Sequence, residues 1–436
     1  MAVLMISGGA VKTLGRALPP HNPNSRPPTI VNELHCDGAV VIADESALTE
    51  LCGISLLERL LRNLQRLGVK KAQIVCANDT VARQACAPTW ARREISVCTD
   101  QFGPAKEAFL FLHAGVYHDA RLLRALSEQT RTTLLIDSAP SADLVPLVRD
   151  AACAAAQVEP QWLQSRAVDS SLFAALRFAA AAREIAVIDV EKQPRYIADL
   201  RRSIRPLWFP APRAENAPQA ERLLLNGAQN GTLDLPAKAH APIETWLVGR
   251  LCRTAITPNQ ITLFTAIVSA VTAVLFATGR LTSGTILALI VGVLDGLDGK
   301  LARVKVETTP LGKREHVIDY MLELAWWTAL AWHFSAYGPL VLLVASDLVD
   351  RLAKRAVKRQ MGRNLDDVAP LDRFVRLIGG RRNIYVWMLA AGMALGAPDH
   401  AFVAICWWGA GTAAVHVIRW LWIHQSACVG DDRLSH

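Results

Sequence analysis

The sequence has no pair of cysteines in C-x-x-C spacing, although nine cysteines are scattered over its 436 residues. Zinc sites and disulfide frameworks normally show closely spaced cysteines, so neither is indicated, and we expect reduced thiols. Charged residues make up only 20% of the chain, whereas 52% of it is hydrophobic. This balance excludes a disordered chain and argues against a wholly soluble protein. Part of the chain is expected to lie in lipid.

The N-terminus also lacks a convincing secretory signal. Residues 1–16 contain one brief apolar stretch, interrupted by Gly8 and Gly9, which is too short for the hydrophobic region of a signal peptide. We therefore expect the N-terminal part to stay in the cytoplasm. The net charge of +8 does not by itself indicate nucleic acid, because the location of the basic residues must be known first.

The first two hundred residues alternate short apolar runs with helical patterns. The apolar runs cover residues 39–43, 73–77, 109–112, 133–136 and 185–190. With a helical pattern over residues 56–67, this alternation predicts an α/β domain with a largely parallel sheet. Residues 205–241 are rich in proline, alanine and asparagine, which favours a connector. The predicted organisation is a domain over 1–204, a linker over 205–241 and a second domain over 242–436.

Long apolar segments dominate the chain after residue 257. They cover residues 261–278, 283–302, 317–335, 339–350, 384–397 and 401–423. Several are short or carry charges and would singly suit a buried helix, but six in succession predict an all-α membrane domain with six transmembrane helices.

Basic residues concentrate between 351 and 382, and the turns around 279–283, 335–338 and 397–400 have almost none. The positive-inside rule places the N-terminal domain, the basic loops and the C-terminus in the cytoplasm, with the protein in the inner membrane. DNA binding is then not needed to explain the charge.

Acidic side chains interrupt the second apolar segment and open the third. They stand in Asp295-Gly-Leu-Asp298-Gly299-Lys-Leu-Ala302-Arg303 and in Glu315-His-Val-Ile-Asp319. Carboxylates at membrane depth are costly and usually functional. The spacing puts each acidic pair on one helix face, where the two pairs can converge.

Four clustered carboxylates require neutralising cations, and such hard oxygen ligands suit Mg²⁺ or Mn²⁺. The sequence therefore predicts a divalent metal site. In the alternative interpretation the acids only pair with the neighbouring Arg303, Lys305 and Arg314 at the membrane surface.

This segment resembles the signature of the CDP-alcohol phosphatidyltransferase family, D-x2-D-G-x2-A-R-x8-G-x3-D-x3-D. The matching positions are Asp295, Asp298, Gly299, Ala302, Arg303 and Gly312. Counting from Gly312 puts His316 and Tyr320 in place of the last two aspartates. A shift of one residue restores an acidic pair, Glu315 and Asp319, and we prefer it because the preceding loop can absorb a deletion. The other alignment describes a catalytically inactive relative.

The resemblance extends upstream and covers roughly residues 240–425. Residues 255–262 are similar to the T-P-N stretch that opens the first transmembrane helix of the family. Physically, Thr257 or Asn259 caps that helix and Pro258 fixes its start. Residues 242–253 have the pattern of an amphipathic helix at the membrane interface.

Members of this family transfer a phosphatidyl or related group from a CDP-activated donor to an alcohol and release CMP. The resemblance therefore implies an integral-membrane phosphotransferase of phospholipid biosynthesis, with a CDP-linked lipid as donor, Mg²⁺ or Mn²⁺ as cofactor and a homodimeric assembly. It also implies roles for single residues. The metal ligands would be Asp295, Asp298, Glu315 and Asp319, with Asp319 also the base, and the CDP moiety would contact Asp295, Gly299, Ala302 and Arg303.

Basic residues after the fourth apolar segment are candidates for binding the phosphate of an acceptor. They are Lys354, Arg355, Lys358, Arg359 and Arg373. A purely topological role explains them equally. The acceptor itself stays open among inositol, inositol phosphate, glycerol phosphate and serine. The fused architecture favours an inositol-like acceptor, by resemblance only.

The N-terminal domain resembles the nucleotidyltransferase fold of sugar-phosphate cytidylyltransferases through residues 51–69 and the strand at 73–77. In that family the first strand leads to a glycine-rich, arginine-containing loop that cradles a triphosphate. Here it leads to Asp44 and Glu45, which would repel a triphosphate, and residues 112–115 contain no metal-binding aspartate. We expect a degenerate domain without cytidylyltransferase activity. A protein with both domains inactive would be a membrane scaffold or regulator, which is the alternative function.

Overall fold

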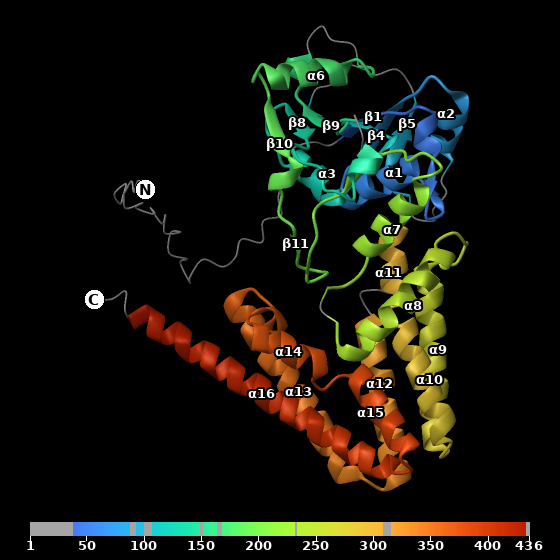
Figure 1. Cartoon of the computed structure of the whole chain (residues 1–436), viewed down its shortest axis with the longest axis vertical. Coiled ribbons are helices and arrows are strands. Elements are labelled where there is room, and N and C mark those ends of the chain that lie inside the picture. Colours follow the sequence, from blue (N-terminus) through green and yellow to red (C-terminus); the bar gives the residue numbers. More distant parts are fainter. Residues whose placement is uncertain are drawn as a thin grey trace, which may run out of the picture. The chain divides into compact units, whose positions relative to one another are not determined.

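The computed structural model describes residues 38–87, 93–99, 107–148, 151–163, 168–231, 233–307 and 315–432, without the side chains of 315, 316 and 426–432. An α/β region lies N-terminal to a helical region (Figure 1). The described helices and strands therefore confirm the two fold classes predicted from the sequence.

Seven strands form the main sheet of the α/β region in the order β10-β8-β9-β6-β1-β4-β5. They are β1 (Gly38–Ile42), β4 (Lys71–Val75), β5 (Ser96–Cys98), β6 (Phe109–His113), β8 (Thr133–Ile136), β9 (Ala155–Val158) and β10 (Ala186–Asp189). Strand β9 pairs antiparallel with β6 and β8, and the other neighbours are parallel. The sheet is thus largely parallel, as predicted. A nucleotidyltransferase-like fold stays a prediction.

Helices cover both faces of this sheet (Figure 1). They are α1 (Leu56–Leu67), α2 (Asp79–Cys86), α3 (Ala120–Ser127), α4 (Val145–Val148), α5 (Pro160–Leu163) and α6 (Leu172–Ala181). Helix α1 starts where Ser55 accepts a hydrogen bond from the Glu58 N–H and ends at Gly68, whose φ of 93° is left-handed. One face of the sheet packs on α1 and α3, and the other packs on α6. Burying a leucine in these layers stabilises the fold by about 1.5–3 kcal/mol.

Short elements complete the α/β region. They are the 3₁₀ helices Glu45–Leu48 and Val190–Lys192 and the strands β2 (Glu50–Leu51), β3 (Ile54–Ser55), β7 (Val116–His118), β11 (Tyr196–Ile197), β12 (Arg202–Ser203) and β13 (Trp208–Pro210). Strand β13 pairs with β7, and helix α7 (Ala217–Gly227) follows it. Residues 205–241, predicted as a connector, thus contain β13, α7 and the start of α8. The position of the domain boundary stays a prediction.

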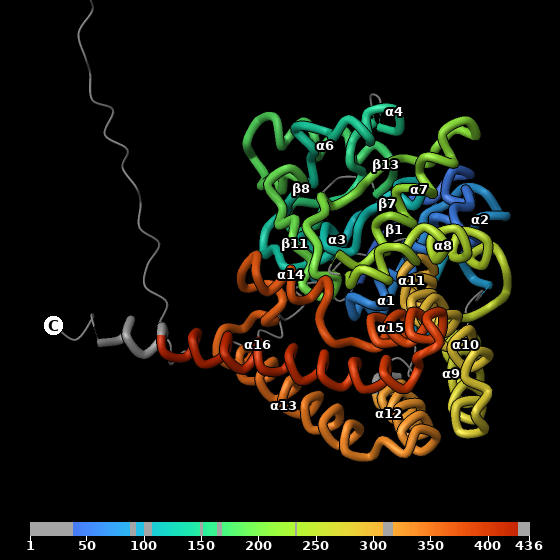
Figure 2. The backbone as a smooth tube through the Cα atoms, turned by 60° about the horizontal axis from the view of Figure 1, so that its bottom comes forward, coloured from blue at the N-terminus to red at the C-terminus, as the bar shows by residue number. Residues whose placement is uncertain are grey.

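The helical region begins with α8 (Leu235–Leu251), which is longer than the predicted interfacial helix. The remaining elements are α9 (Pro258–Ala277), α10 (Leu281–Leu294), α11 (Leu297–Val304), α12 (Glu315–Phe334), α13 (Tyr337–Met361), η4 (Leu365–Asp367), α14 (Pro370–Ile378), α15 (Arg382–Ala394) and α16 (Pro398–Asp432). Helices α13 and α16 lie side by side in both views (Figures 1 and 2), and α9 packs against α10 and α12.

Three helical stretches of the described chain are long and apolar enough to cross a membrane. They are Pro258–Ala277, Leu281–Val304 and Pro398–Gln425. Of the other predicted spans, α12 carries Asp319 and Glu323, α13 is charged along its second half, and α15 has only 13 residues. A single span needs about 20 apolar residues, so these three fall short on charge or length. Three candidate spans are supported, and six remain a prediction.

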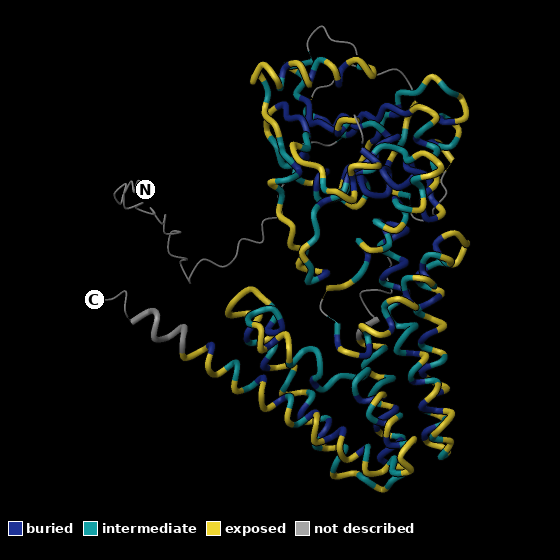
Figure 3. The backbone as a smooth tube through the Cα atoms, viewed as in Figure 1, coloured by how far each residue is buried: buried dark blue, intermediate teal, exposed yellow. Residues whose placement is uncertain are grey.

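Aromatic residues fill the core of the helical region. Trp326 is buried and donates a hydrogen bond from its indole N–H to the Ser269 carbonyl over 2.7 Å. Trp327 is also buried, with its ring edge-on to Tyr385 at 5.6 Å between centroids, whereas Trp332 is exposed. Figure 3 shows this mixture of buried and exposed positions along the helices, which resembles neither a uniform core nor a uniform surface. Exposed apolar side chains of this kind are typical of helices that contact lipid.

The α/β region packs directly on two helices of the helical region. Its core continues into Val248 of α8 and into Leu301 and Val304 of α11. Arg59 of α1 donates to the Val304 carbonyl over 2.5 Å, and Arg62 donates to the Lys305 carbonyl over 2.7 Å. These bonds tie the end of α11 to the α/β region.

Burial of His118 in strand β7 predicts acid sensitivity. Burial lowers the pKa of His118 to about 3, whereas an unfolded histidine has a pKa of about 6.5. Between these values the unfolded state binds the extra proton, so stability falls as the pH drops below 6.5. From pH 6.5 to 5 the loss should be about 2 kcal/mol. Chemical unfolding of the full chain should therefore show a smaller loss over this range in His118→Leu, and an equal loss in both proteins would contradict the assignment.

Candidate active site

Asp298 is held at the start of α11 by the first turn of α9. It is buried, and its Oδ2 accepts a hydrogen bond from Thr262 Oγ1 over 2.7 Å. The cap of α9 fixes this turn, because Thr257 accepts from the Gln260 N–H over 3.3 Å and Gln260 accepts from the Thr257 N–H over 2.9 Å. The T-P-N stretch therefore caps the helix, as predicted, and it also presents Thr262 to Asp298.

Asp295 caps the end of α10 and faces α15. Its Oδ2 lies 2.5 Å from a guanidinium nitrogen of Arg382, the first residue of α15. Arg382 is also within electrostatic reach of Asp319 and Glu323 on α12. One arginine thus gathers acidic groups from two different helices. Sequence reasoning missed this role because Arg382 lies at the end of the basic stretch that the positive-inside rule explains.

Glycine at position 296 lets α8 approach the acidic segment closely. A Cβ at Gly296 would lie 2.7 Å from the Glu244 carboxyl carbon. Glu244 forms an ion pair of 2.5 Å with Lys300, and both side chains are almost fully buried. A buried pair needs both partners, because removing one leaves an uncompensated charge. Helix α8 is therefore locked to the segment between Asp295 and Arg303, a feature the sequence did not reveal.

Gly299, Ala302 and Arg303 lie on the short helix α11. The Arg303 guanidinium folds back along the helix, so that a Cβ at Gly299 would lie 3.4 Å from its Nη1. Its Nε donates to the Ala228 carbonyl, after α7, over 2.8 Å. Three of the four residues predicted to contact CDP are therefore on one short helix, and Asp295 lies just before it. The Arg303 guanidinium limits the space beside Gly299.

Helix α12 supplies the second acidic pair. Asp319 is half-buried on its first turns, and the side chain of Glu315 lies outside the described residues. Within the described side chains, no group of three acidic, histidine or cysteine residues lies close enough to hold a metal ion. The chemistry of Asp295 and Asp298 nevertheless fits a hard divalent cation, because both side chains offer carboxylate oxygens. The complete ligand set stays a prediction.

The predicted acceptor-phosphate residues differ in their surroundings. Lys354 of α13 donates to Asp350 over 2.6 Å, and Asp350 also contacts His416 of α16. The others are exposed, namely Arg355, Lys358, Arg359 and Arg373. Lys354 therefore has a local partner, and the exposed side chains have room to bind an anion.

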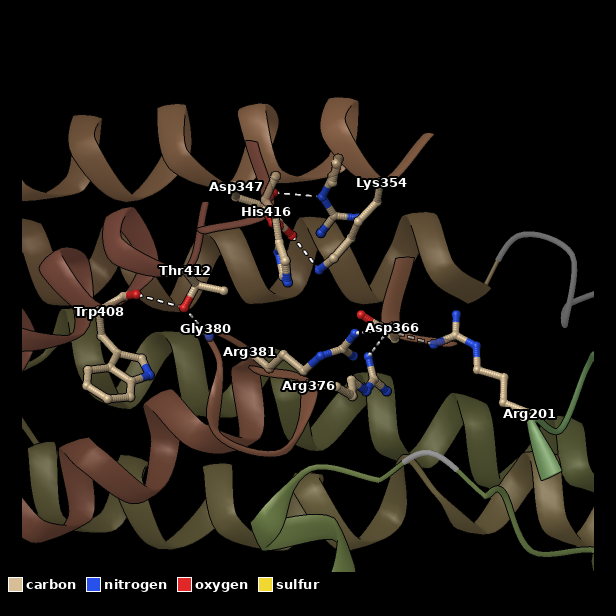
Figure 4. Close-up of polar contacts among 12 residues, drawn as sticks. Arg201, Asp347, Lys354, Asp366, Arg376, Gly380, Arg381, Trp408, Thr412 and His416 are labelled. Atoms are coloured by element: carbon tan, nitrogen blue, oxygen red, sulfur yellow. Dashed lines mark hydrogen bonds and ion pairs between the residues drawn. The ribbon is translucent and has the colours of Figure 1, made fainter. Parts of the chain in front are cut away.

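Three arginines do converge, on Asp366 of η4 (Figure 4). Arg201 from the α/β region lies 2.8 Å away, Arg376 of α14 lies 3.4 Å away, and Arg381 lies 3.5 Å away. Asp366 is buried, so its charge needs these partners. The residue next to Arg381 is Arg382, which binds Asp295. Arg381 and Arg382 are neighbours at the start of α15. They thus connect Asp295 with Asp366, the residue that Arg201 of the α/β region contacts.

In the α/β region, the ends of β1 and β6 bring Asp44 and His113 together. The His113 Nε2 lies 3.7 Å from Asp44 Oδ2. Burial lowers the pKa of His113, and Asp44 opposes that shift only in part. The acidic residues predicted to repel a triphosphate thus lie at the strand ends, where a parallel sheet usually carries its site. A degenerate domain without cytidylyltransferase activity stays a prediction.

Comparison with known proteins gives a family match within the helical region. Residues 255–415 match the family model of CDP-alcohol phosphatidyltransferase. The chain is similar to the bifunctional IPC transferase and DIPP synthase of Aquifex aeolicus, with 27% identity over 206 residues that cover 45% of this chain and 47% of the relative. It is also similar to the phosphatidylinositol phosphate synthase of Mycobacteroides abscessus, with 28% identity over 135 residues, or 28% of this chain and 60% of the relative.

The chain spans about half the length of the first relative and less than two thirds of the second. A solved structure of a Mycobacterium tuberculosis phosphatidylinositol phosphate synthase with CDP-DAG bound is 20% identical, with 42% of this chain and 92% of that chain covered and a TM-score of 0.32. The family match confirms the resemblance predicted from the signature.

The close approach at Gly296 predicts a large effect of a small substitution. In Gly296→Ala the new methyl group would collide with the Glu244 carboxylate, which Lys300 holds in place. Overpacking of this kind costs about 1–3 kcal/mol. Thermal unfolding in detergent should therefore show a lower melting temperature for this variant. Gly338→Ala, with no atom within 4 Å of its new Cβ, is the matched control. Equal melting temperatures for the two variants would contradict the locked geometry.

Proposed function

We propose that the CDP-alcohol phosphatidyltransferase domain over residues 255–415 moves a phosphatidyl or related phospho group from a CDP-linked lipid to an alcohol and releases CMP. The family match and the complete D-x2-D-G-x2-A-R run carry this proposal. The contacts of Asp295 and Asp298 support it, because both are positioned by other helices rather than left in solvent.

The proposed donor site joins acids and small residues on adjoining helices. Asp295, Asp298, Glu315 and Asp319 are the proposed ligands of Mg²⁺ or Mn²⁺. With a divalent cation bound, these carboxylates would meet the pyrophosphate of the donor without repulsion. Thr262 holds Asp298, and Arg382 orients Asp295.

The nucleotide half of the donor is proposed to lie along α11. Gly299 leaves space for the ligand, Ala302 adds only a methyl group, and Arg303 offers a guanidinium to phosphate. The lipid chains would remain in the bilayer beside the candidate spans.

Asp319 is the proposed base. The oxygen of the acceptor hydroxyl would form a bond to the lipid-linked β-phosphorus, the bond from that phosphorus to the CMP oxygen would break, and Asp319 would receive the hydroxyl proton. Its place on α12 is within electrostatic reach of Arg382.

The proposed acceptor is inositol or inositol phosphate. Support comes from the name of the Mycobacteroides abscessus relative, a phosphatidylinositol phosphate synthase. Exposed Arg355, Lys358, Arg359 and Arg373, with Lys354 beside them, would bind an acceptor phosphate from the water phase. Six spans, a cytoplasmic N-terminal domain without cytidylyltransferase activity and a homodimer complete the proposal.

The proposed base gives the most direct test of this function. With purified protein in vesicles that contain radiolabelled CDP-diacylglycerol and Mg²⁺, Asp319→Asn should slow CMP release about 100-fold or more, because a positioned base contributes about 10²–10⁴. Asp298→Asn should also abolish release. Asp399→Asn, an exposed acid on the first turn of α16, is the matched control and should keep wild-type activity.

A panel of acceptors in the same assay identifies the alcohol. Inositol phosphate or inositol should support release, and glycerol phosphate and serine should not. If folded wild-type protein releases no CMP with any of these alcohols, the transferase proposal fails and the scaffold or regulatory alternative is favoured.

A further inference from the structure

An arginine-lined cavity lies where the α/β region meets the end of α11. It has a volume of about 470 Å³, and its lining comes from α1, α3, α7, α11 and the β11–β12 hairpin. Cavities of this size suit small molecules rather than macromolecular partners. Of the described side chains of the proposed donor site, Asp295, Asp298 and Asp319 do not line the cavity, whereas Arg303 does.

The lining of this cavity is strongly positive. It includes five arginines, at positions 59, 66, 121, 124 and 303, and two aspartates, at positions 119 and 199. Asp119 is already used, because Arg121 binds both of its oxygens, at 3.1 and 2.7 Å. Asp199 is exposed. The remaining arginines therefore leave a surplus of positive charge around the cavity.

Arg59 is the most unusual member of this set. Its side chain is 2% exposed, and its two terminal nitrogens donate only to the backbone carbonyls of Val304 and Leu51. Its Nε is buried without a hydrogen-bond partner, and among the described residues Arg59 forms no ion pair. Burial lowers the pKa of Arg59, because desolvation disfavours the charged guanidinium. Arginine is almost never buried without a counter-charge, so this position calls for an anion.

Arg66 and Arg124 stand at the exposed rim of the cavity. No hydrogen bond or ion pair ties either side chain within the part of the chain that the structure describes. Their guanidinium groups can therefore turn toward a ligand without breaking an existing contact. Guanidinium binds phosphate through two parallel hydrogen bonds, a geometry that suits an arginine-lined cavity.

We propose that this cavity binds a small phosphate-bearing molecule, a nucleotide or a phosphorylated polyol, between Arg59 at its floor and Arg66 and Arg124 at its rim. The site shares Arg303 with the nucleotide half of the proposed donor site, but Arg59, Arg66 and Arg124 belong to this cavity alone, and binding here does not require the transferase reaction. Because Arg303 also lines the cavity and Arg59 holds the Val304 carbonyl, the bound anion would contact the end of α11.

Calorimetric titration of the full-length protein in detergent tests this site. The probes are inorganic phosphate, CMP and inositol 1-phosphate, all in EDTA, so that binding through a divalent cation at the donor site does not contribute. At least one probe should bind, more weakly at high salt, and comparison of the three shows whether the phosphate alone, a nucleotide or a polyol is recognised.

The double variant Arg66→Gln/Arg124→Gln should weaken this binding about tenfold or more, because it removes two charge-assisted contacts. Its melting temperature without ligand should be unchanged, since neither side chain has a partner to lose among the described residues. Arg83→Gln/Arg222→Gln, with the same change of net charge at exposed positions outside the cavity, is the matched control and should bind like wild type.

Three results would overturn the proposal. They are no binding of any probe by folded protein, equal binding by the rim variant and wild type, and equal loss in the rim variant and its charge-matched control. The first also leaves the transferase proposal untouched, because CMP release depends on the acidic residues and is measured separately.

Discussion

The structure depends on one electrostatic constraint, which is that acidic groups within an apolar helical segment need a partner. Arg382 lies beside Asp295, Thr262 donates to Asp298, and Lys300 neutralises Glu244. Each of these contacts joins two different helices, so the acidic segment fixes the positions of α8, α9 and α15 around it. Unpaired charges at such depth would cost several kcal/mol, and that cost makes the arrangement specific.

The α/β region contributes to the same arrangement through backbone contacts and arginines. Arg59 and Arg62 hold the carbonyls that end α11, and Arg201 reaches Asp366 next to the segment that carries Arg382. A domain whose own strand ends carry Asp44 rather than a phosphate-binding loop can thus still serve the membrane domain. The role proposed for this domain is to position the end of α11 and to form the arginine-lined cavity, and its lack of nucleotidyl transfer stays a prediction.

Local signals in the sequence predicted what is locally determined. Helix α1 begins and ends where expected, because Ser55 and Gly68 mark its ends, and β8 occupies the predicted range. Strand β9 was missed because Ala-Ala-Gln-Val has no strong apolar pattern and depends on pairing with β6 and β8. The site partners were missed for the same reason. Arg59 and Val304 are 245 residues apart, and no sequence spacing indicates such a contact.

The central claim is that Asp295, Asp298, Glu315 and Asp319 together bind divalent cations. Electron paramagnetic resonance of Mn²⁺ titrated into the purified protein measures this directly, because bound Mn²⁺ loses the sharp signal of the free ion. Wild-type protein should bind Mn²⁺, Glu315→Gln should lose most of that binding, and His316→Gln should keep it. No binding by wild-type protein, or loss in His316→Gln with retention in Glu315→Gln, would contradict the account.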